Sequence, residues 1–430
     1  MEKIFITELT IRNVRHLKDI RIPLSDGTAK HLILTGKNGS GKTSVLEALS
    51  RYFNELMMLE GQKGTAEREK ELKRRMLLYA QLLSEQRSQG GKENGSRRIE
   101  KEIHGSNNEG ISYIMQLAYE KNGVEIRLNQ PFCSLIDGFR KGRFILAYYK
   151  AERIFYADKP GHIEKIDLKD YYTMEENPRE EFIKYLSDLK VTEALARAKG
   201  KNEKADAIRQ WFEKFQKLLR RTFDDPSLEL IFEEDTFSFS IKEKNREIFD
   251  FNTLASGYAA ILDIMADLMM RMMKNTDRSF DFNMPGIVLI DEIETHLHLE
   301  LQKSVLDILT EVFPNIQFIM STHSPFILNS LENAVIYDLE KKMIVENGLT
   351  NIPYSGIVEG YFKSSEMSDS LKEKFERYKT LTSKQDLSDD DFEEIAELEM
   401  FLDEIPDYLA LGITTEYQRI KMEFESREDI

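Results

Sequence analysis

Cysteine is almost absent from this chain, since Cys133 is the only one in 430 residues. An intrachain disulfide and a metal site built from several cysteines are therefore both excluded. Long apolar runs are also missing, because no stretch approaches the roughly 18 residues that a membrane-spanning helix needs. The first residues show no apolar core behind a basic start, as a secretion signal would. These absences predict a cytoplasmic chain without a membrane partner.

An excess of positive charge is missing as well. The formal net charge is -16 and the isoelectric point is about 5.2, which argues against a uniformly basic coat for nucleic acid. The charge is uneven, since residues 385–430 contain 16 acids and 3 bases. Residues 61–104 contain 11 bases and 7 acids and leave room for a local basic face. Most acids of the tail are expected to lie on solvated helix faces.

The apolar residues that are present alternate in several short segments and follow helical spacing in others. Predicted strands cover residues 4–11, 19–23, 31–34, 111–117, 124–128, 143–149, 228–232, 236–241, 287–290 and 316–320, with a hairpin at 333–345. Predicted helices cover residues 42–56, most of 169–221, 256–273 and much of the chain after 368, where Ser388 and Asp391 form a capping box ahead of Phe392, Ile395, Leu398, Leu402 and Ile405.

The segment 36–43 matches the pattern G-x-x-x-x-G-K-[ST] between a predicted strand and a predicted helix. Glycines let successive backbone N–H groups curl around phosphate oxygens, and the helix adds the positive end of its dipole. Lys42 is placed to reach the β- and γ-phosphates of ATP, and the Thr43 hydroxyl to bind Mg²⁺. The predicted nucleotide-binding residues are Gly36, Asn38, Gly39, Ser40, Gly41, Lys42, Thr43 and Ser44.

Two acids follow the apolar run at 287–290, which is typical of a central parallel strand buried on both faces. Ligands of α/β proteins bind at the carboxyl ends of such strands. Asp291 is therefore placed to hold Mg²⁺ together with Thr43. Glu292 is placed to polarise the water that attacks the γ-phosphate, which makes it the predicted catalytic base.

A second buried-type strand precedes the loop Ser-Thr-His-Ser-Pro at 321–325. If the two strands are parallel neighbours, His323 reaches the same edge as Asp291 and can donate to the γ-phosphate. His296 and His298 suggest a zinc site near Glu294 as an alternative. Two histidines two residues apart form a weak ligand set without cysteine, so an interface loop is favoured for them.

Taken in order, these motifs resemble the ABC-type ATPase head, in the branch of the RecF and SMC repair proteins and the overcoming-lysogenisation-defect nucleases. Residues 9–15, Leu-Thr-Ile-Arg-Asn-Val-Arg, are similar to the first strand of that branch. Residues 254–258, Leu-Ala-Ser-Gly-Tyr, resemble the signature loop, which in this family caps the ATP held by a second subunit. The resemblance covers the start to about residue 50 and about 251–338, and implies that Ser256 and Gly257 contact a partner's nucleotide.

The chain departs from the family pattern at two places. The usual signature begins Leu-Ser-Gly-Gly, whereas Ala255 and Ser256 occupy its second and third positions. The hydroxyl is thus missing or displaced by one residue, which bears on the rate of hydrolysis more than on binding. No Gln loop is evident. Residues 148–153 occupy a plausible place for it, where Arg153 either approaches the nucleotide or lies in a surface turn.

The fold implied by the resemblance is an α/β P-loop ABC-type ATPase head, a mixed sheet with flanking helices, with helical insertions and a helical C-terminal tail. The expected divisions are an N-terminal ATPase lobe at 1–155 with a polar helical insertion at about 58–110, a helical insertion at 156–225, a C-terminal ATPase lobe at 226–350 and an acidic helical tail at 351–430.

Within this branch, residues 256–258, 291–298 and 358–362 look like those of ATPases from bacterial anti-phage systems. Two such ATPases are similar in design: that of Septu, which works with an HNH nuclease, and that of PARIS, which works with a TOPRIM nuclease. After residue 339 the sequence contains neither a TOPRIM carboxylate pattern nor the Cys and His cluster of an HNH nuclease. Nuclease chemistry is therefore expected in a partner.

The resulting prediction is an ATP- and Mg²⁺-dependent ATPase of an anti-phage complex that dimerises head to head, or forms a higher homo-oligomer. It would control a partner nuclease, with the HNH type favoured over the TOPRIM type, and respond to DNA or a phage protein. The alternative is a RecF- or SMC-like repair ATPase that acts directly on DNA through the basic residues near 61–110. A transporter subunit is disfavoured by the RecF-like start and the loop at 321–325.

Overall fold

The computed structural model describes residues 3–25, 27–60, 118–158, 161–162, 165–244, 247–276, 279–357, 369–403 and 411–427. Four predicted features lie outside these ranges: the basic residues 61–104, the strand at 111–117, the segment 358–362 and Ile405. The chain divides into two units, Met1–Asn351 and Ile352–Ile430. No helix among the described residues has the length and apolar content needed to cross a membrane.

The larger unit is built on a six-stranded sheet with the strand order β12, β11, β3, β10, β9, β5. Five strands run parallel, and β12 pairs antiparallel with β11. The mixed sheet predicted from the sequence is thereby confirmed. Its strands are β3 (His31–Thr35), β5 (Ile145–Tyr149), β9 (Gly286–Ile290), β10 (Ile316–Ser321), β11 (Ala334–Asp338) and β12 (Met343–Glu346).

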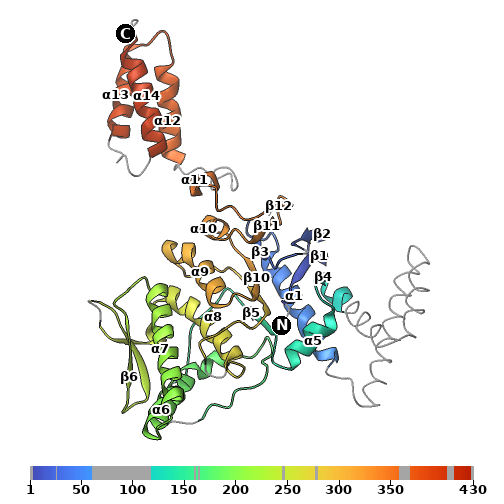
Figure 1. Ribbon diagram of the computed structural model, residues 1–430. Coiled ribbons are helices and arrows are strands. Elements are labelled where there is room, and N and C mark those ends of the chain that lie inside the picture. The colour runs from blue at the N-terminus through green and yellow to red at the C-terminus, as the bar shows by residue number, and fades with distance from the viewer. Residues whose placement is uncertain are drawn as a thin grey trace, which may run out of the picture. The chain divides into compact units, whose positions relative to one another are not determined.

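Helices cover both faces of this sheet, which explains why every residue of β3, β9, β10 and β11 is buried. Alternate residues such as Leu32, Leu34 and Leu289 share one core with α1 (Lys42–Glu60) and α5 (Phe132–Arg140). In Figure 1, α8 (Ser256–Met272) and α9 (Leu299–Val312) lie on the other side of the strands. Helix α5 was not among the predicted helices, although Phe132, Leu135, Ile136 and Phe139 are buried at helical spacing.

A three-stranded antiparallel sheet in the order β2, β1, β4 packs into the same core beside α1. These strands are β1 (Ile6–Val14), β2 (Leu17–Pro23) and β4 (Val124–Leu128). On the opposite side, short α10 (Pro325–Leu328) follows β10 and packs near α9. The parallel strands thus end together at one edge, where the loops after β3, β9 and β10 meet.

Residues between β5 and α8 form an insertion with its own aromatic core, in which Trp211 and Phe215 lie 5.3 Å apart. The prediction of helix over most of 169–221 is confirmed, since helices cover residues 178–198 and 202–222. The residues before 178 are not helical, and the carbonyls of Tyr172, Thr173 and Glu176 accept hydrogen bonds from Arg271. Gly200, at φ 65°, follows the end of the first long helix of this insertion, residues 182–198. The elements are η1 (Pro178–Glu181), α6 (Phe182–Ala198), α7 (Asn202–Thr222), β6 (Glu229–Glu233), β7 (Ser238–Lys242), β8 (Phe249–Asp250) and η2 (Phe251–Thr253).

The smaller unit is helical. Its core joins Phe375, Tyr378, Ile395 and Tyr417 from three helices. The capping box is confirmed, since the Asp391 N–H donates to Ser388 Oγ at 3.2 Å and the Ser388 N–H donates to Asp391 Oδ2 at 3.0 Å. The helices are α11 (Tyr354–Gly356), α12 (Asp369–Thr382), α13 (Asp389–Asp403) and α14 (Leu411–Glu425).

Candidate nucleotide-binding site

The phosphate loop, residues 36–43, joins β3 to α1 and depends on three glycines in the left-handed region. Gly36, Gly39 and Gly41 have φ angles of 130°, 81° and 102°. A Cβ on Gly36 would lie 2.9 Å from Ser40 Oγ, and one on Gly41 would lie 2.8 Å from Leu17 Cδ1. Side chains are therefore excluded by both backbone conformation and space. The loop leaves Lys37, Asn38, Gly39 and Thr43 exposed and buries Gly36, Ser40, Lys42 and Ser44.

The residues of this loop fit a phosphate group. The Lys42 ammonium is buried and donates to the carbonyls of Gly36 at 2.9 Å and Lys37 at 3.2 Å. The hydroxyl of Ser40 is buried without a hydrogen-bond partner, which is costly unless a ligand supplies one. A cation held inside a ring of peptide groups, with an unpaired hydroxyl beside it, is suited to an anion with several oxygens.

Negative charge surrounds this lysine. Burial lowers the pKa of Lys42 below its ordinary value, and the charges of Glu292, Glu294, Asp291 and Asp338 oppose that shift. The loop, the acids after β9 and the end of β11 therefore share one electrostatic environment. Such a concentration of carboxylates next to a phosphate loop is what a divalent cation would neutralise.

Asp291 lies at the carboxyl end of β9 and meets the loop directly. Its Oδ1 accepts hydrogen bonds from Thr43 Oγ1 at 3.2 Å and from Ser321 Oγ at 2.5 Å. Asp291 is buried, and β9 lies beside β10 in parallel register. These oxygen atoms are the type that Mg²⁺ prefers. Thr43 and Asp291 are thus placed to hold the ion.

Glu292 has an unusual backbone, with φ at 44°. Its N–H donates to Ser321 Oγ at 2.8 Å, and its side-chain Oε2 accepts from Thr295 Oγ1 at 3.1 Å. A left-handed conformation is unfavourable for a residue with a side chain and persists only where neighbours hold it. The carboxylate of Glu292 is therefore fixed beside Asp291 rather than free in a turn.

His323 follows β10 and reaches the same edge, as expected for parallel neighbours. The backbone N–H of His323 donates to Glu294 Oε1 at 2.5 Å. Burial lowers the pKa of the His323 imidazole, and the charge of Lys42 lowers it further, against the opposing charges of Glu294, Glu292 and Asp291. The ring is therefore neutral at pH 7, so that it can both donate and accept a hydrogen bond.

Ser256 and Gly257 begin α8 away from the phosphate loop. Within the described ranges neither makes a hydrogen bond or ion pair with that loop, and Ser256 is exposed. Gly257 instead packs against the loop after the acids, where a Cβ would lie 2.9 Å from the His296 carbonyl oxygen. The N-cap residue of α8, Ala255, makes no side-chain capping hydrogen bond. His296 and His298 are exposed beside it, and no cluster of metal-ligating side chains occurs in the part of the chain described.

Arg153 does not lie in a surface turn. The side chain is 4% exposed, and its guanidinium donates to the carbonyls of Asp291 at 2.7 Å and Glu292 at 2.8 Å. It also donates to the carbonyls of Lys150 at 2.8 Å and Ile293 at 3.3 Å. Arg153 therefore supports the acid-bearing loop from beneath rather than lying in a surface turn.

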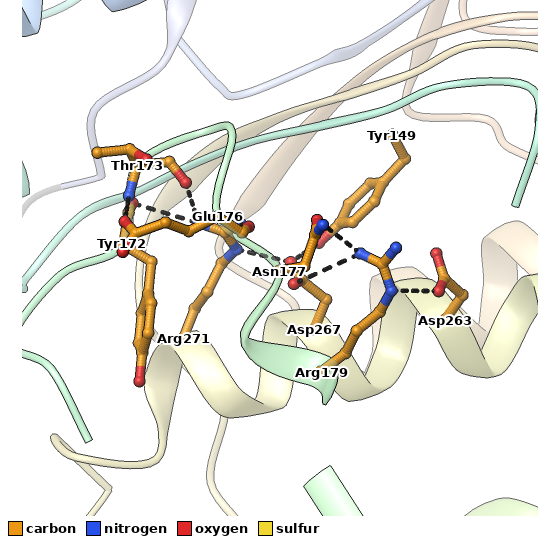
Figure 2. A network of polar contacts seen from close by, with 9 residues as sticks. All are labelled: Tyr149, Tyr172, Thr173, Glu176, Asn177, Arg179, Asp263, Asp267 and Arg271. Carbon is orange, nitrogen blue, oxygen red and sulfur yellow. Dashed lines mark hydrogen bonds and ion pairs between the residues drawn. The ribbon is translucent and has the colours of Figure 1, made fainter. Parts of the chain in front are cut away.

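A buried charge network holds the signature helix α8 in place (Figure 2). Asp267 accepts hydrogen bonds from Tyr149 Oη and Arg271 Nε, both at 2.6 Å. Asp263 forms an ion pair with Arg179 of η1. Because Tyr149 ends β5 and the Asp291 N–H donates to its carbonyl at 2.8 Å, the network joins the signature helix to the edge that carries the acids.

This network predicts a pH dependence of stability. Burial raises the pKa of Asp263 to about 7 from its ordinary 3.8, opposed by Arg179. The folded chain therefore binds more protons than the unfolded chain between these values, and the free energy of unfolding falls as pH rises through them. We expect Asp263→Asn to gain stability relative to the wild type by more than about 1 kcal/mol between pH 5 and pH 8.

The measurement is urea unfolding at several pH values. Trp211, the only tryptophan, is buried in the larger unit and provides the fluorescence signal. Asp235→Asn, in an exposed turn, is the matched control and should show no such gain. A constant difference between Asp263→Asn and the wild type across this range would contradict the prediction.

Three polar residues of this site were not among the predicted site residues. The Ser321 hydroxyl donates to Asp291 Oδ1 and accepts from the Glu292 N–H. Its position directly before Thr322 and His323 could have identified it as a site residue. Arg153 was considered only for the nucleotide itself. Asp338 ends β11 and accepts from the N–H groups of Glu340 and Lys341 at 2.9 Å, behind Gly36. Nothing in the sequence separated it from other acids.

Comparison with known proteins places these features in a family. Residues 32–329 match the family model described as "AAA domain, putative AbiEii toxin, Type IV TA system". The chain belongs to this family. The match begins in β3 and ends just after α10, so it includes the phosphate loop, the acids, His323 and the signature helix of this AAA-domain chain.

Two relatives come from anti-phage systems. The AAA-domain chain is 26% identical over 429 residues to Septu protein PtuA of Bacillus mycoides (strain KBAB4), covering 96% of this chain and 52% of that protein. It is 30% identical over 156 residues to the Retron Ec83 probable ATPase of Escherichia coli, covering 35% of this chain and 29% of that protein. The chain thus spans about half or less of the length of these relatives. The predicted resemblance to ATPases of anti-phage systems is confirmed.

A solved structure gives a weaker likeness. The SMC head domain from Thermotoga maritima is 14% identical with a TM-score of 0.33, covering 78% of this chain and 94% of that chain. A score this low bears on neither function nor partners. The α/β architecture of the AAA-domain chain rests on its own sheet order and loop geometry.

Proposed function

We propose that this chain binds and hydrolyses ATP with Mg²⁺ as a subunit of an anti-phage defence complex. The observation that carries the proposal is the direct contact of Thr43 with Asp291 across the phosphate loop and the end of β9. That contact joins the hydroxyl of Thr43, at the end of the loop, to the carboxylate of Asp291, next to buried Lys42. Membership of the AAA family and the resemblance to Septu and Retron ATPases support the same proposal.

Each residue then has a separate task. The N–H groups of the phosphate loop and Lys42 would bind the β- and γ-phosphates, with Thr43 and Asp291 holding Mg²⁺. The ion would neutralise charge that develops on the phosphate oxygens. Glu292 would accept a proton from the attacking water. The neutral His323 would donate a hydrogen bond to the γ-phosphate, while Glu294 fixes the backbone of His323.

A second copy of the chain would complete the site. Ser256 is exposed at the uncapped start of α8 and makes no contact with the phosphate loop of its own chain among the described residues. An uncapped helix start favours a negatively charged group. In a head-to-head dimer, Ser256 and Gly257 of each copy would meet the γ-phosphate bound by the other copy. Two ATP molecules would therefore lie in one interface.

The partner would be a nuclease. The resemblance to the Septu ATPase favours an HNH nuclease, with a TOPRIM nuclease as the second choice. ATP state would control that nuclease in response to DNA or a phage protein.

The test uses the chain with the product of its neighbouring gene. We expect the two proteins to copurify, and cells that carry both genes to form fewer phage plaques than cells that lack either gene. Plaque counts and mass spectrometry of the purified complex give the readout. The proposal fails if the chain purifies without a neighbouring-gene product and its deletion leaves phage resistance unchanged. ATP turnover stimulated by DNA alone, with no partner, would favour a repair ATPase.

A further inference from the structure

Residues 153–157, which we name the strap, follow β5 and belong to no helix or strand. Arg153, Phe155 and Ala157 are buried, at 4%, 3% and 1% exposed, while Ile154 and Tyr156 are 79% and 58% exposed. This alternation is expected of an extended chain with one face against the protein. Arg153, Phe155 and Ala157 are therefore the residues through which the strap contacts the rest of the protein.

The first end of the strap holds the carboxylate loop, residues 291–293. The Arg153 guanidinium donates to all three carbonyls of this loop, at 2.7, 2.8 and 3.3 Å. The Glu292 N–H is bound by Ser321 Oγ and its carbonyl by Arg153. The two peptide groups that flank the Glu292 Cα are therefore both fixed, which accounts for the left-handed φ of 44°.

The other end of the strap holds residues 251–252, which lie just before the signature loop at 254–258. The Ala157 N–H donates to Asn252 Oδ1 at 3.0 Å, and Asn252 Nδ2 donates back to the Ala157 carbonyl at 2.9 Å. The ring of Phe155 lies 6.2 Å from that of Phe251. Asn252 is therefore tied on both sides to the strap, only two residues from Leu254.

We propose that the strap couples the carboxylate loop to the signature loop of the same chain, with Arg153 and Asn252 as its positioning residues. This rests on the proposed head-to-head ATPase, in which those two loops serve different ATP molecules. Seating of the signature loop on the partner's ATP would move Asn252 and, through the strap, adjust Glu292 for the chain's own ATP. The two sites of the dimer would thereby be energetically coupled.

The test is a double-mutant cycle on ATP turnover by the full chain. We expect Arg153→Met and Asn252→Leu each to lower kcat about tenfold with KM within about threefold of the wild type, because the phosphate loop is unchanged. The double variant should be no slower than the slower single variant, since either change already breaks the strap. Arg153→Lys should recover part of the kcat lost in Arg153→Met.

Two matched controls separate coupling from general disruption. Arg220→Met removes another arginine that donates to a backbone carbonyl, at 2.8 Å. Asn129→Leu removes another asparagine that both donates to and accepts from the backbone. Both should keep the kcat of the wild type. If Asn252→Leu does not fold, Asn252→Asp, which keeps the acceptor for the Ala157 N–H, replaces it and should lower kcat less.

Effects that multiply in the double variant, or single variants with unchanged kcat, would overturn the strap as a coupling element. Failure of the proposed function is distinguished by Glu292→Gln in the same assay. Suppose that the wild type turns over ATP, that Glu292→Gln does not, and that the effects of Arg153→Met and Asn252→Leu multiply. The proposed function then stands, and only the coupling through the strap is wrong. If the wild type does not turn over ATP, the proposed function and the coupling that rests on it both fail.

Discussion

Glu292→Gln is expected to lower ATP turnover by at least about 100-fold while leaving ATP binding intact, because the amide cannot accept the proton of the attacking water. The change keeps the size of the side chain, and the backbone contacts of residue 292 to Ser321 and Arg153 do not involve the carboxylate. ATP that is bound but not hydrolysed should then hold two copies of the chain together as a dimer. Turnover by phosphate release and dimer mass by light scattering provide the measurements.

A second variant tests whether the dimer is head to head. Ser256→Arg places a bulky cation at an exposed position of α8, and should stop that residue from contacting the partner's ATP without disturbing the phosphate loop of its own chain. Each variant alone is expected to be inactive. A one-to-one mixture should recover at most about a quarter of wild-type turnover, since half of the dimers are mixed and each has one intact site of two. The recovery should be about tenfold smaller where the strap couples the two sites as proposed. Equal turnover in the wild type and Glu292→Gln would refute the assigned base.

Lys42→Ala is expected to weaken ATP binding by about 100-fold, since a charged hydrogen bond to phosphate is worth about 3 kcal/mol. The ammonium is buried within the phosphate loop, and no other lysine side chain is placed there among the described residues. Turnover and ATP-induced dimerisation should both be lost. Isothermal titration with ATP and Mg²⁺ measures the change directly.

Lys37→Ala is the matched control for this loss. Lys37 lies in the same loop, but its side chain is exposed and pairs with Glu340 at 3.0 Å. Its removal should change ATP affinity by less than about threefold, as is usual for an exposed ion pair. Similar losses of affinity in the two variants would mean that Lys42 has no special part in binding.

The sequence was sufficient where function depends on local pattern. The phosphate loop, the acids after β9 and the placement of His323 follow from short motifs joined to buried parallel strands. The order of those strands could not be derived from spacing alone.

The parts that could not be predicted depend on distant partners. Asp263, Asp267 and Arg271 interrupt an apolar run, and no local pattern indicates that Asp263 pairs with Arg179 or that Asp267 binds Tyr149 and Arg271. Arg153 was ambiguous for the same reason, because its carbonyl partners lie about 140 positions away. Contacts of this kind are set by tertiary packing rather than by local propensity.

The ammonium of Lys42 already occupies the centre of the phosphate loop by binding two of its carbonyls. The entropy of ordering these residues is thus lost when the chain folds and not when nucleotide arrives. ATP entry becomes an exchange of partners around a fixed cation. Association should therefore be rapid and nearly independent of loop rearrangement, so that differences in affinity among nucleotides arise in their rates of departure.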